Sequence, residues 1–301
     1  MYFVTFEVNG KSEIGILTKN KEAVIPLKAA EAECLGSNQL PSDMLGLIEQ
    51  GDSAVALVEK ILEEDESRCT SIPIEEVRIL APIPRPRKNI FCIGKNYREH
   101  AFEFEKTKDE NVAIPKYPVI FTKAPTAVIG PNDVINRHSE VTQQLDYEVE
   151  LAVVIGRSGS YIPQEQAMDW VFGYTIINDV SARDLQKLHV QWVRGKGLDT
   201  FAPMGPYLVH KSSITDPENL SISLKVNGEI RQNANTNELI FKIPELIATI
   251  SAGITLEPGD IIATGTPAGV GMGFEPPRFL QEGDELELEI SDLGILKNTV
   301  G

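Results

Sequence analysis

The sequence predicts an α+β fold that is mostly β, with a small N-terminal α/β domain over residues 1–81 and a larger domain over residues 82–301. Short runs that alternate apolar and polar residues recur along the larger part, which is the pattern of half-buried strands. One helical apolar stripe lies early in the chain, and a proline-rich segment follows it. These observations favour a β-rich roll or sandwich with helical insertions over a regular parallel α/β sheet.

The N-terminal domain is predicted to begin with a β-hairpin over its first 25 or so residues. Two alternating runs flank Val8-Asn9-Gly10-Lys11, where Asn-Gly supplies the positive φ values of a tight turn. The apolar residues that next recur at helical spacing are Ala54, Leu57, Val58, Ile61 and Leu62. They predict a helix that ends in the acidic run 63–66, which we expect to be solvated. Residues 81–88 contain three prolines and form neither a helix nor a central strand, so they mark the domain boundary.

The larger domain is predicted to consist of short strands punctuated by Gly, Pro and Asp, with a few short helices between them. The predicted strands cover residues 119–121, 149–155, 174–178, 222–226, 260–263 and 285–290.

Composition excludes two classes of partner. The 301 residues are 42% hydrophobic, which is ample for a core, and the formal net charge of -16 repels nucleic acid and anionic membranes. The chain has no basic start with an apolar run behind it and no apolar segment of membrane-spanning length, so we expect a cytosolic protein. Cys34, Cys69 and Cys92 form no Cys-x-x-Cys pair, so we expect buried free thiols.

Carboxylates at the start of the predicted strand 149–155 indicate a cation site. Glu148 and Glu150 share one face, and that face continues as Ala152 and Val154, which belong in the core. Acids at such a boundary are costly unless their charge is compensated. The strand 285–290 differs, because it keeps an acid at every position of one face and is an ordinary amphipathic strand. Spacing alone also allows a half-exposed strand with its acids in water.

A third acid, Asp179, follows the apolar strand 174–178. The next residues, Ser181-Ala182-Arg183-Asp184, have the [ST]-x-x-[DE] pattern of a helix start, which places Asp179 at a strand-to-helix corner. Three hard oxygen ligands would suit Mg²⁺ or Mn²⁺.

A candidate general base lies in Asn96-Tyr97-Arg98-Glu99-His100-Ala101-Phe102-Glu103. His100 and Glu103 are three apart, so on a helical turn the carboxylate would orient the imidazole. Pairs at this spacing are also common on surfaces. Here the pair follows a strand that ends in Gly94, and the polar residues 105–111 behind it have the character of a mobile lid.

Gly269-Val270-Gly271-Met272-Gly273 follows a strand as a dinucleotide-binding loop would. The next residues, Phe274-Glu275-Pro276-Pro277, cannot open the helix that such a site requires, so we expect a mobile loop instead.

In this order, several blocks resemble the fumarylacetoacetate hydrolase family. They are Gly94–Tyr97 with His100, Asp146–Leu151, Asn178–Gln186, Lys196–Thr200 with Pro203–Pro206, and Gly259–Gly271. The resemblance extends from about Pro82 to the C-terminus, and the first 80 residues resemble the accessory domain of longer bacterial members. It implies a β-sandwich roll catalytic domain of the family's type and a homodimer, closest to the bacterial acylpyruvase and oxaloacetate decarboxylase branch.

The resemblance also implies a set of site residues. A divalent ion would be held by Glu148, Glu150 and Asp179, with the substrate's carboxylate and 2-oxo oxygen completing its coordination. The residues expected to contact substrate are Arg183, Gln186, Thr200 and Thr266, and those expected to take part in catalysis are His100, Glu103 and Lys196.

The expected activity is metal-dependent cleavage of a carbon–carbon bond in a small 2-oxo acid, by oxaloacetate decarboxylation, acylpyruvate hydrolysis or both. Chelation by Mg²⁺ or Mn²⁺, together with Lys196, would stabilise the enolate left when the bond breaks. One alternative is an isomerase or decarboxylase of an unsaturated dicarboxylate from aromatic catabolism. The other is a non-catalytic protein that binds a 2-oxo acid while its N-terminal domain engages a protein partner.

Overall fold

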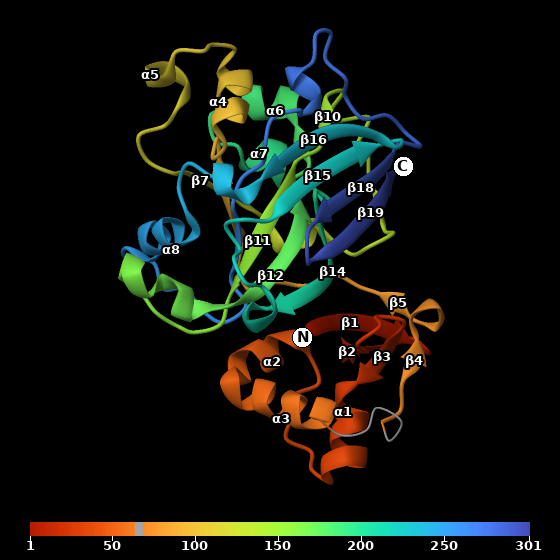
Figure 1. The fold of residues 1–301 in the computed structure, drawn as a ribbon. Helices are drawn as coiled ribbons and strands as arrows, with labels where there is room; N and C mark the ends of the chain where they lie inside the picture. The colour runs from red at the N-terminus through yellow and green to blue at the C-terminus, as the bar shows by residue number, and fades with distance from the viewer. Residues whose placement is uncertain (64–68) are drawn as a thin grey trace.

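In the computed structural model the chain forms two main β-sheets flanked by short helices (Figure 1). The structure describes residues 1–63 and 69–301. The larger sheet is 12-stranded, in the order β4-β3-β2-β1-β14-β12-β11-β17-β6-β7, with β5 on β1 and β8 on β14; the smaller is 5-stranded, in the order β16-β15-β18-β19-β9. The predicted α+β class with more strand than helix is confirmed.

The strands of the larger sheet are β1 (Tyr2–Val8), β2 (Lys11–Leu17), β3 (Ala23–Pro26), β4 (Ile72–Pro73), β5 (Arg78–Ile79), β6 (Ile90–Gly94), β7 (Val119–Lys123), β8 (Val128–Ile129), β11 (Val149–Ile155), β12 (Val171–Asn178), β14 (Ala202–His210) and β17 (Ile261–Ala263). Those of the smaller sheet are β9 (Val134–Ile135), β15 (Ser221–Val226), β16 (Glu229–Asn235), β18 (Glu285–Ile290) and β19 (Gly294–Val300), and a separate pair is β10 (Leu145–Asp146) with β13 (Ser181–Ala182). The helices are α1 (Leu27–Ala30), α2 (Met44–Gln50), α3 (Asp52–Glu63), α4 (Arg98–Glu105), α5 (Glu110–Ala113), α6 (Arg183–Leu188), α7 (Val193–Lys196) and α8 (Ile243–Ser251).

The predicted N-terminal elements are present. β1 and β2 form the hairpin, and Asn9 and Gly10 at its turn have φ values of 51° and 73°. Helix α3 buries its apolar stripe, as the helical spacing requires. The rest of the predicted acidic run, residues 64–66, lies outside the described residues.

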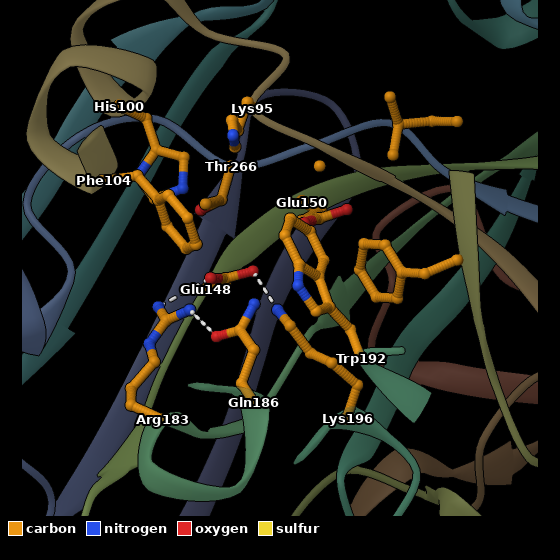
Figure 2. A pocket seen from close by; sticks show the side chains of 13 residues that line it. Lys95, His100, Phe104, Glu148, Glu150, Arg183, Gln186, Trp192, Lys196 and Thr266 are labelled. Carbon is orange, nitrogen blue, oxygen red and sulfur yellow. Dashed lines mark hydrogen bonds and ion pairs between the residues drawn. The ribbon is translucent and has the colours of Figure 1, made fainter. Parts of the chain in front are cut away.

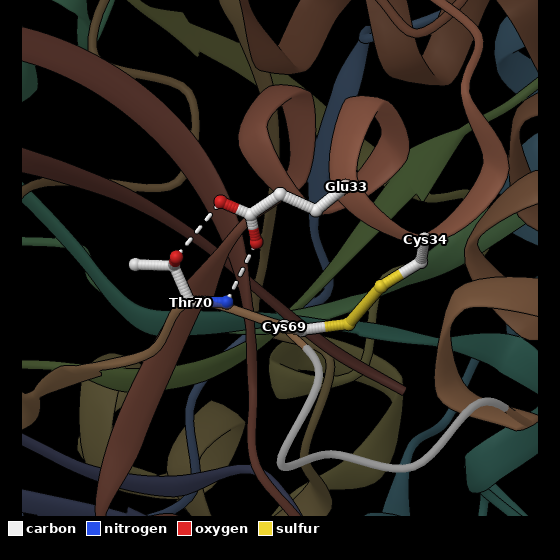
Figure 3. Close-up of a disulfide and its surroundings, with 4 residues drawn as sticks. All are labelled: Glu33, Cys34, Cys69 and Thr70. Carbon is white, nitrogen blue, oxygen red and sulfur yellow. Dashed lines mark hydrogen bonds between the residues drawn. A yellow bond between two sulfur atoms is a disulfide. The ribbon is translucent and has the colours of Figure 1, made fainter.

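The prediction of free cysteines is wrong for two of the three. Cys34 and Cys69 form a disulfide across a sequence separation of 35 (Figure 3), and Cys92 is a buried free thiol. Beside the bridge, the Glu33 carboxylate accepts hydrogen bonds from the backbone N–H and the hydroxyl of Thr70, each at 2.8 Å. The distant spacing of the two cysteines carried no motif that could have shown this pairing.

Strand β1 joins the N-terminal elements to the rest of the chain. It pairs antiparallel with β14 through Tyr2↔Val209 and Phe3↔Leu208, so the first strands extend the sheet that contains β11 and β12. In Figure 1 the strands β1 to β5 and the helices α1 to α3, in red and orange, lie below β11 and β12. The boundary at residues 81 and 82 falls just after β5, where the proline-rich segment begins, and the division into two domains stays a prediction.

Strands β11 and β12 form the centre of the sheet and are buried at every residue. Their register pairs Val149 with Asn178. Glu148, which precedes Val149, and Asp179, which follows Asn178, therefore lie at the same end of the two strands. Among the described residues, no helix has the length and apolar character needed to cross a membrane.

Candidate active site

The acidic trio predicted from the sequence meets at the end of β11 and β12. Glu148, Glu150 and Asp179 are 4%, 1% and 0% exposed, and each offers one oxygen within 4.8 Å of the others. Backbone contacts fix this arrangement. Asp179 N–H donates to Glu148 C=O at 2.9 Å, and Glu148 N–H donates to the side-chain oxygen of Asn178 at 3.0 Å. The half-exposed alternative therefore does not describe these residues.

Buried cations neutralise two of the three acids. Lys196 Nζ lies 2.8 Å from Glu148 Oε2 and 2.8 Å from Asp179 Oδ2. Arg183 Nη2 lies 2.6 Å from Glu148 Oε1, and Lys123 Nζ lies 2.8 Å from Asp179 Oδ1. Burial alone would raise the pKa of Glu148, but Lys196 and Arg183 outweigh it and hold that pKa well below its usual range. Burial lowers the pKa of Lys123 despite the attraction of Asp179.

Glu150 differs from its two neighbours. In residues 1–63 and 69–301 it has no ion-pair partner, and its Oε2 accepts one hydrogen bond, from Gly265 N–H at 2.9 Å. Burial, Asp179 and Glu148 raise its pKa well above the usual value. A buried carboxylate with this surplus of negative charge beside it is stabilised by a cation. Three carboxylate oxygens close together are the donors that Mg²⁺ or Mn²⁺ prefers, so the residues fit a divalent ion.

Arg183 joins the acids to a residue that the sequence analysis did not single out. Its Nε donates to Asp146 Oδ2 at 2.8 Å and its Nη1 to Gln186 Oε1 at 3.1 Å. Asp146 is fully buried and forms part of β10. Helix α6 begins at Arg183 rather than at Ser181, because Ser181 belongs to β13 and its hydroxyl donates to Asp179 C=O instead of capping the helix. The observed N-cap is Ala182, one residue after the predicted N-cap Ser181.

The predicted His–Glu pair lies on α4. His100 Nδ1 is 3.1 Å from Glu103 Oε2, and the histidine is 4% exposed. Since the carboxylate only accepts hydrogen bonds, this contact places a proton on Nδ1 and leaves Nε2 for other partners. The structure therefore makes this a buried pair rather than an exposed surface one.

Two members of the trio, Glu148 and Glu150, line one pocket together with His100 (Figure 2). Asp179 is fully buried and does not line it. The pocket's empty space, open solvent at the mouth included, is about 260 Å³. The rings of Phe104, Phe121 and Trp192 form an aromatic wall, with Trp192 centroids 5.6 Å and 5.2 Å from the two phenylalanines. Lys95 also lines the pocket; it forms an ion pair with Glu105 of α4 and has a left-handed backbone, with φ of 55°. Figure 2 shows Lys95 on the His100 side of the glutamates and Lys196 on the other.

The two threonines predicted to contact substrate differ in position. Thr266 lines the pocket, but its hydroxyl donates to Val149 C=O at 2.9 Å and accepts from Gln232 Nε2 at 2.8 Å. Thr200 lies outside the pocket, and its hydroxyl accepts from Asn136 N–H at 2.9 Å.

Lys123 and Gln232 also support the site, and the sequence analysis missed both. Gln232 is fully buried; its oxygen accepts from Val149 N–H at 3.0 Å, so it links the turn at Thr266 to the residue between the two glutamates. A lysine at the end of the apolar strand β7 was a usable signal for Lys123. No such signal existed for Gln232, because its strand β16 is mostly polar in sequence.

Comparisons with known proteins identify the family of this chain. The family model described as "Fumarylacetoacetate (FAA) hydrolase C-terminal" matches residues 89–301. The chain is 49% identical to the oxaloacetate tautomerase YisK of Bacillus subtilis, with 100% of both chains covered. A fumarylacetoacetate hydrolase structure from Exiguobacterium antarcticum is 39% identical with a TM-score of 0.83, covering 100% of this chain and 99% of that one.

A second similar structure carries ligands. The maleylpyruvate hydrolase of Sphingobium sp. SYK-6, in complex with manganese(II) and pyruvate, is 30% identical with a TM-score of 0.77, covering 100% of this chain and 98% of that one.

Proposed function

This chain belongs to the fumarylacetoacetate hydrolase family, and we propose that it is a divalent-metal-dependent enzyme that interconverts the enol and keto forms of a small 2-oxo dicarboxylate such as oxaloacetate. One observation carries the proposal. A histidine held by a glutamate lines the same pocket as Glu148 and Glu150, two members of a buried acidic trio that fits Mg²⁺ or Mn²⁺. Similarity to a protein named as an oxaloacetate tautomerase supports the choice of reaction.

Binding of the 2-oxo acid depends on charges that the protein holds in place. A bound Mg²⁺ or Mn²⁺, held by Glu148, Glu150 and Asp179, would polarise the 2-oxo group and stabilise negative charge on its oxygen. Lys196 and Arg183 keep Glu148 ionised, so that it stays able to bind a cation. The oxygen of Gln186 is taken up by Arg183, so Gln186 presents its NH₂ group to an anionic oxygen of the substrate.

His100 carries the proton in this proposal. Glu103 fixes the ring through Nδ1, so Nε2 accepts the proton from the enol oxygen and returns it to the carbon next to the 2-oxo group. The enzyme ends the cycle in its starting state, because one proton is taken and one is given back. The aromatic wall of Phe104, Phe121 and Trp192 limits the access of water to this transfer.

Lys95 makes the pocket suited to a second carboxylate. Three lysine and arginine side chains line the pocket, and two of them, Lys196 and Arg183, are already paired with buried acids. The partner of Lys95 is Glu105, which is 31% exposed. Exchange of Glu105 for a carboxylate of the substrate leaves Glu105 in water, so this exchange costs little.

Carbon–carbon cleavage is a second candidate. Loss of CO₂ from oxaloacetate passes through an enolate of the same kind, and a His100-activated water would attack an acylpyruvate. Similarity to a maleylpyruvate hydrolase favours keeping this candidate.

Direct assays separate these activities. Purified protein with Mg²⁺ or Mn²⁺ is given enol-oxaloacetate, acetylpyruvate or fumarylpyruvate, and proton NMR follows the enol, the ketone and pyruvate. We expect the enol form of oxaloacetate to disappear faster than without the protein, with no equal formation of pyruvate. Pyruvate formed at the rate of enol loss supports cleavage instead, and no turnover of any substrate identifies a binding protein.

A further inference from the structure

We propose that the glycine-rich loop 269–273 holds the Glu103 carboxylate in position beside His100. In this proposal Gly273 is a positioning residue for proton transfer by His100. The inference rests on the proposed function, because it takes His100 as the residue that carries the proton. It assigns a role to the glycine-rich motif 269–273, which the residues behind it rule out as a dinucleotide-binding loop.

Glu103 is held from two directions. Its Oε2 contacts His100 Nδ1 within helix α4, while Gly269 N–H donates to its two oxygens at 3.1 and 3.3 Å. The side chain is 15% exposed, so this carboxylate is largely enclosed between the helix and the loop. A rotamer of Glu103 that kept only one of these contacts would turn the carboxylate away from the imidazole.

Gly273 provides the space that this rotamer occupies. It belongs to the short 3₁₀ turn η8 (Gly271–Gly273), and a Cβ there would lie 1.9, 2.2 and 2.5 Å from Oε1, Cδ and Cγ of Glu103. All three atoms belong to one flexible side chain. The backbone of Gly273 is not in the left-handed region, so its φ is compatible with alanine, and the three atoms nearest to the added Cβ all belong to Glu103.

Gly269 is a different case. Its φ is 105°, and a Cβ there would lie 1.9 Å from the backbone oxygen of Arg231. Substitution of Gly269 would therefore disturb the backbone, whereas substitution of Gly273 isolates the effect on the carboxylate.

The same loop also holds the opposite side of the site. Gly271 N–H and Met272 N–H donate to Asp146 at 2.6 and 3.0 Å, and Asp146 in turn binds Arg183, the partner of Glu148. The loop thus contacts both the pair on α4 and the charged network around the trio. This places His100 and the bound substrate in a fixed relation, which the transfer of a proton requires. In the structure these backbone groups are hydrogen-bonded, and the mobility expected of the loop stays a prediction.

The test is the variant Gly273→Ala, assayed with oxaloacetate. We expect kcat to fall by about 10- to 100-fold, less than the roughly 10²- to 10⁴-fold contribution of a general acid–base group, because the imidazole stays and only its alignment is lost. KM should be nearly unchanged. The pH dependence of kcat should change as it does in Glu103→Ala. Mn²⁺ affinity by calorimetry and Tm should match the wild type, because neither the trio nor the core is touched.

A double mutant distinguishes alignment from a general defect. In Glu103→Ala the conflicting side chain is absent, so adding Gly273→Ala should cost nothing further. Additive losses, a lowered Mn²⁺ affinity, or full activity in Gly273→Ala with a wild-type pH profile would each overturn the inference. If the wild-type protein turns over none of the 2-oxo acids, the proposed function fails first, and that result is separate from these.

Discussion

Glu148 and Glu150 lie two residues apart at the start of β11, yet Glu148 is paired with Lys196 and Arg183 while Glu150 has no basic partner among the described residues. The difference makes Glu150 the acid most dependent on an added cation.

Glu150→Gln should therefore abolish binding of Mg²⁺ and Mn²⁺ while keeping the fold, because the amide has the same shape and its oxygen still accepts from Gly265 N–H. At an ion concentration 100 times Kd, the wild type gains about 2.7 kcal/mol of unfolding free energy, and the variant should gain none. Urea unfolding with and without Mg²⁺ measures this gain. Glu289→Gln, in the amphipathic strand β18, is the control and should keep it. A variant at Glu150 that retained the gain would show that the ion binds elsewhere.

His100→Ala should remove catalysis and leave ion binding intact, because the ring is the proton carrier and contributes no ligand to the trio. We expect kcat for enol loss to fall by about 10²- to 10⁴-fold. Stopped-flow absorbance measures the rate, and calorimetry with Mn²⁺ provides the control. Unchanged kcat would remove His100 from the mechanism.

Lys95→Met should weaken binding of dicarboxylates selectively. We expect KM for oxaloacetate to rise by about 10-fold or more, since a lost charge-assisted hydrogen bond is worth about 1.5–3 kcal/mol. KM for acetylpyruvate, whose distal end is neutral, should hardly change. Glu105→Gln, which removes the present partner of Lys95, is the matched variant and should not raise KM for oxaloacetate. Equal losses for both substrates would contradict a role for Lys95 in selecting a second carboxylate.

Reduction of the Cys34–Cys69 bridge should destabilise the N-terminal part. Chain-entropy arguments for a loop of this length give about 4 kcal/mol of unfolding free energy, part of which strain or residual structure can offset. Urea unfolding with and without dithiothreitol measures the change. Cys69→Ser should have the lower stability and no response to the reductant; a wild type that also failed to respond would show that the thiols are free.

His210 should make stability depend on pH. Burial, the N-terminal amine and Lys211 lower the pKa of its imidazole from 6.5 to about 4. Between those values the unfolded chain binds more protons than the folded one, so the free energy of unfolding falls as pH falls from 6.5 toward 4. His210→Gln should flatten this part of the curve, while His189→Gln, at an exposed position, should not. If the wild type and both variants gave parallel curves of unfolding free energy against pH, the role of His210 would be contradicted.

Much of the fold was predictable because its signals are local. Alternation and turn residues give the β1–β2 hairpin, β11 and β18 with correct or nearly correct bounds. The trio was predictable for a related reason, since Glu148 and Glu150 interrupt an otherwise apolar strand face.

The rest depends on contacts between distant segments. Three contacts join residues that no short-range pattern relates. They are the Cys34–Cys69 disulfide, the ion pair of Lys123 with Asp179, and the hydrogen bond from Gly269 N–H to the Glu103 carboxylate. Helix α6 begins one residue later than the N-cap at Ser181 predicts, because a hydroxyl that can cap a helix can equally bind a nearby carbonyl. The homodimer and the cytosolic location stay predictions.

The pairing of β1 with β14 has a practical consequence for any attempt to shorten the protein. Residues 82–301 contain every member of the proposed pocket, yet in that fragment Leu208 and Val209 would lose the strand that shields them. A bare, apolar sheet border of this kind recruits other chains. A truncated enzyme should therefore tend to self-associate unless its new border carries charged residues.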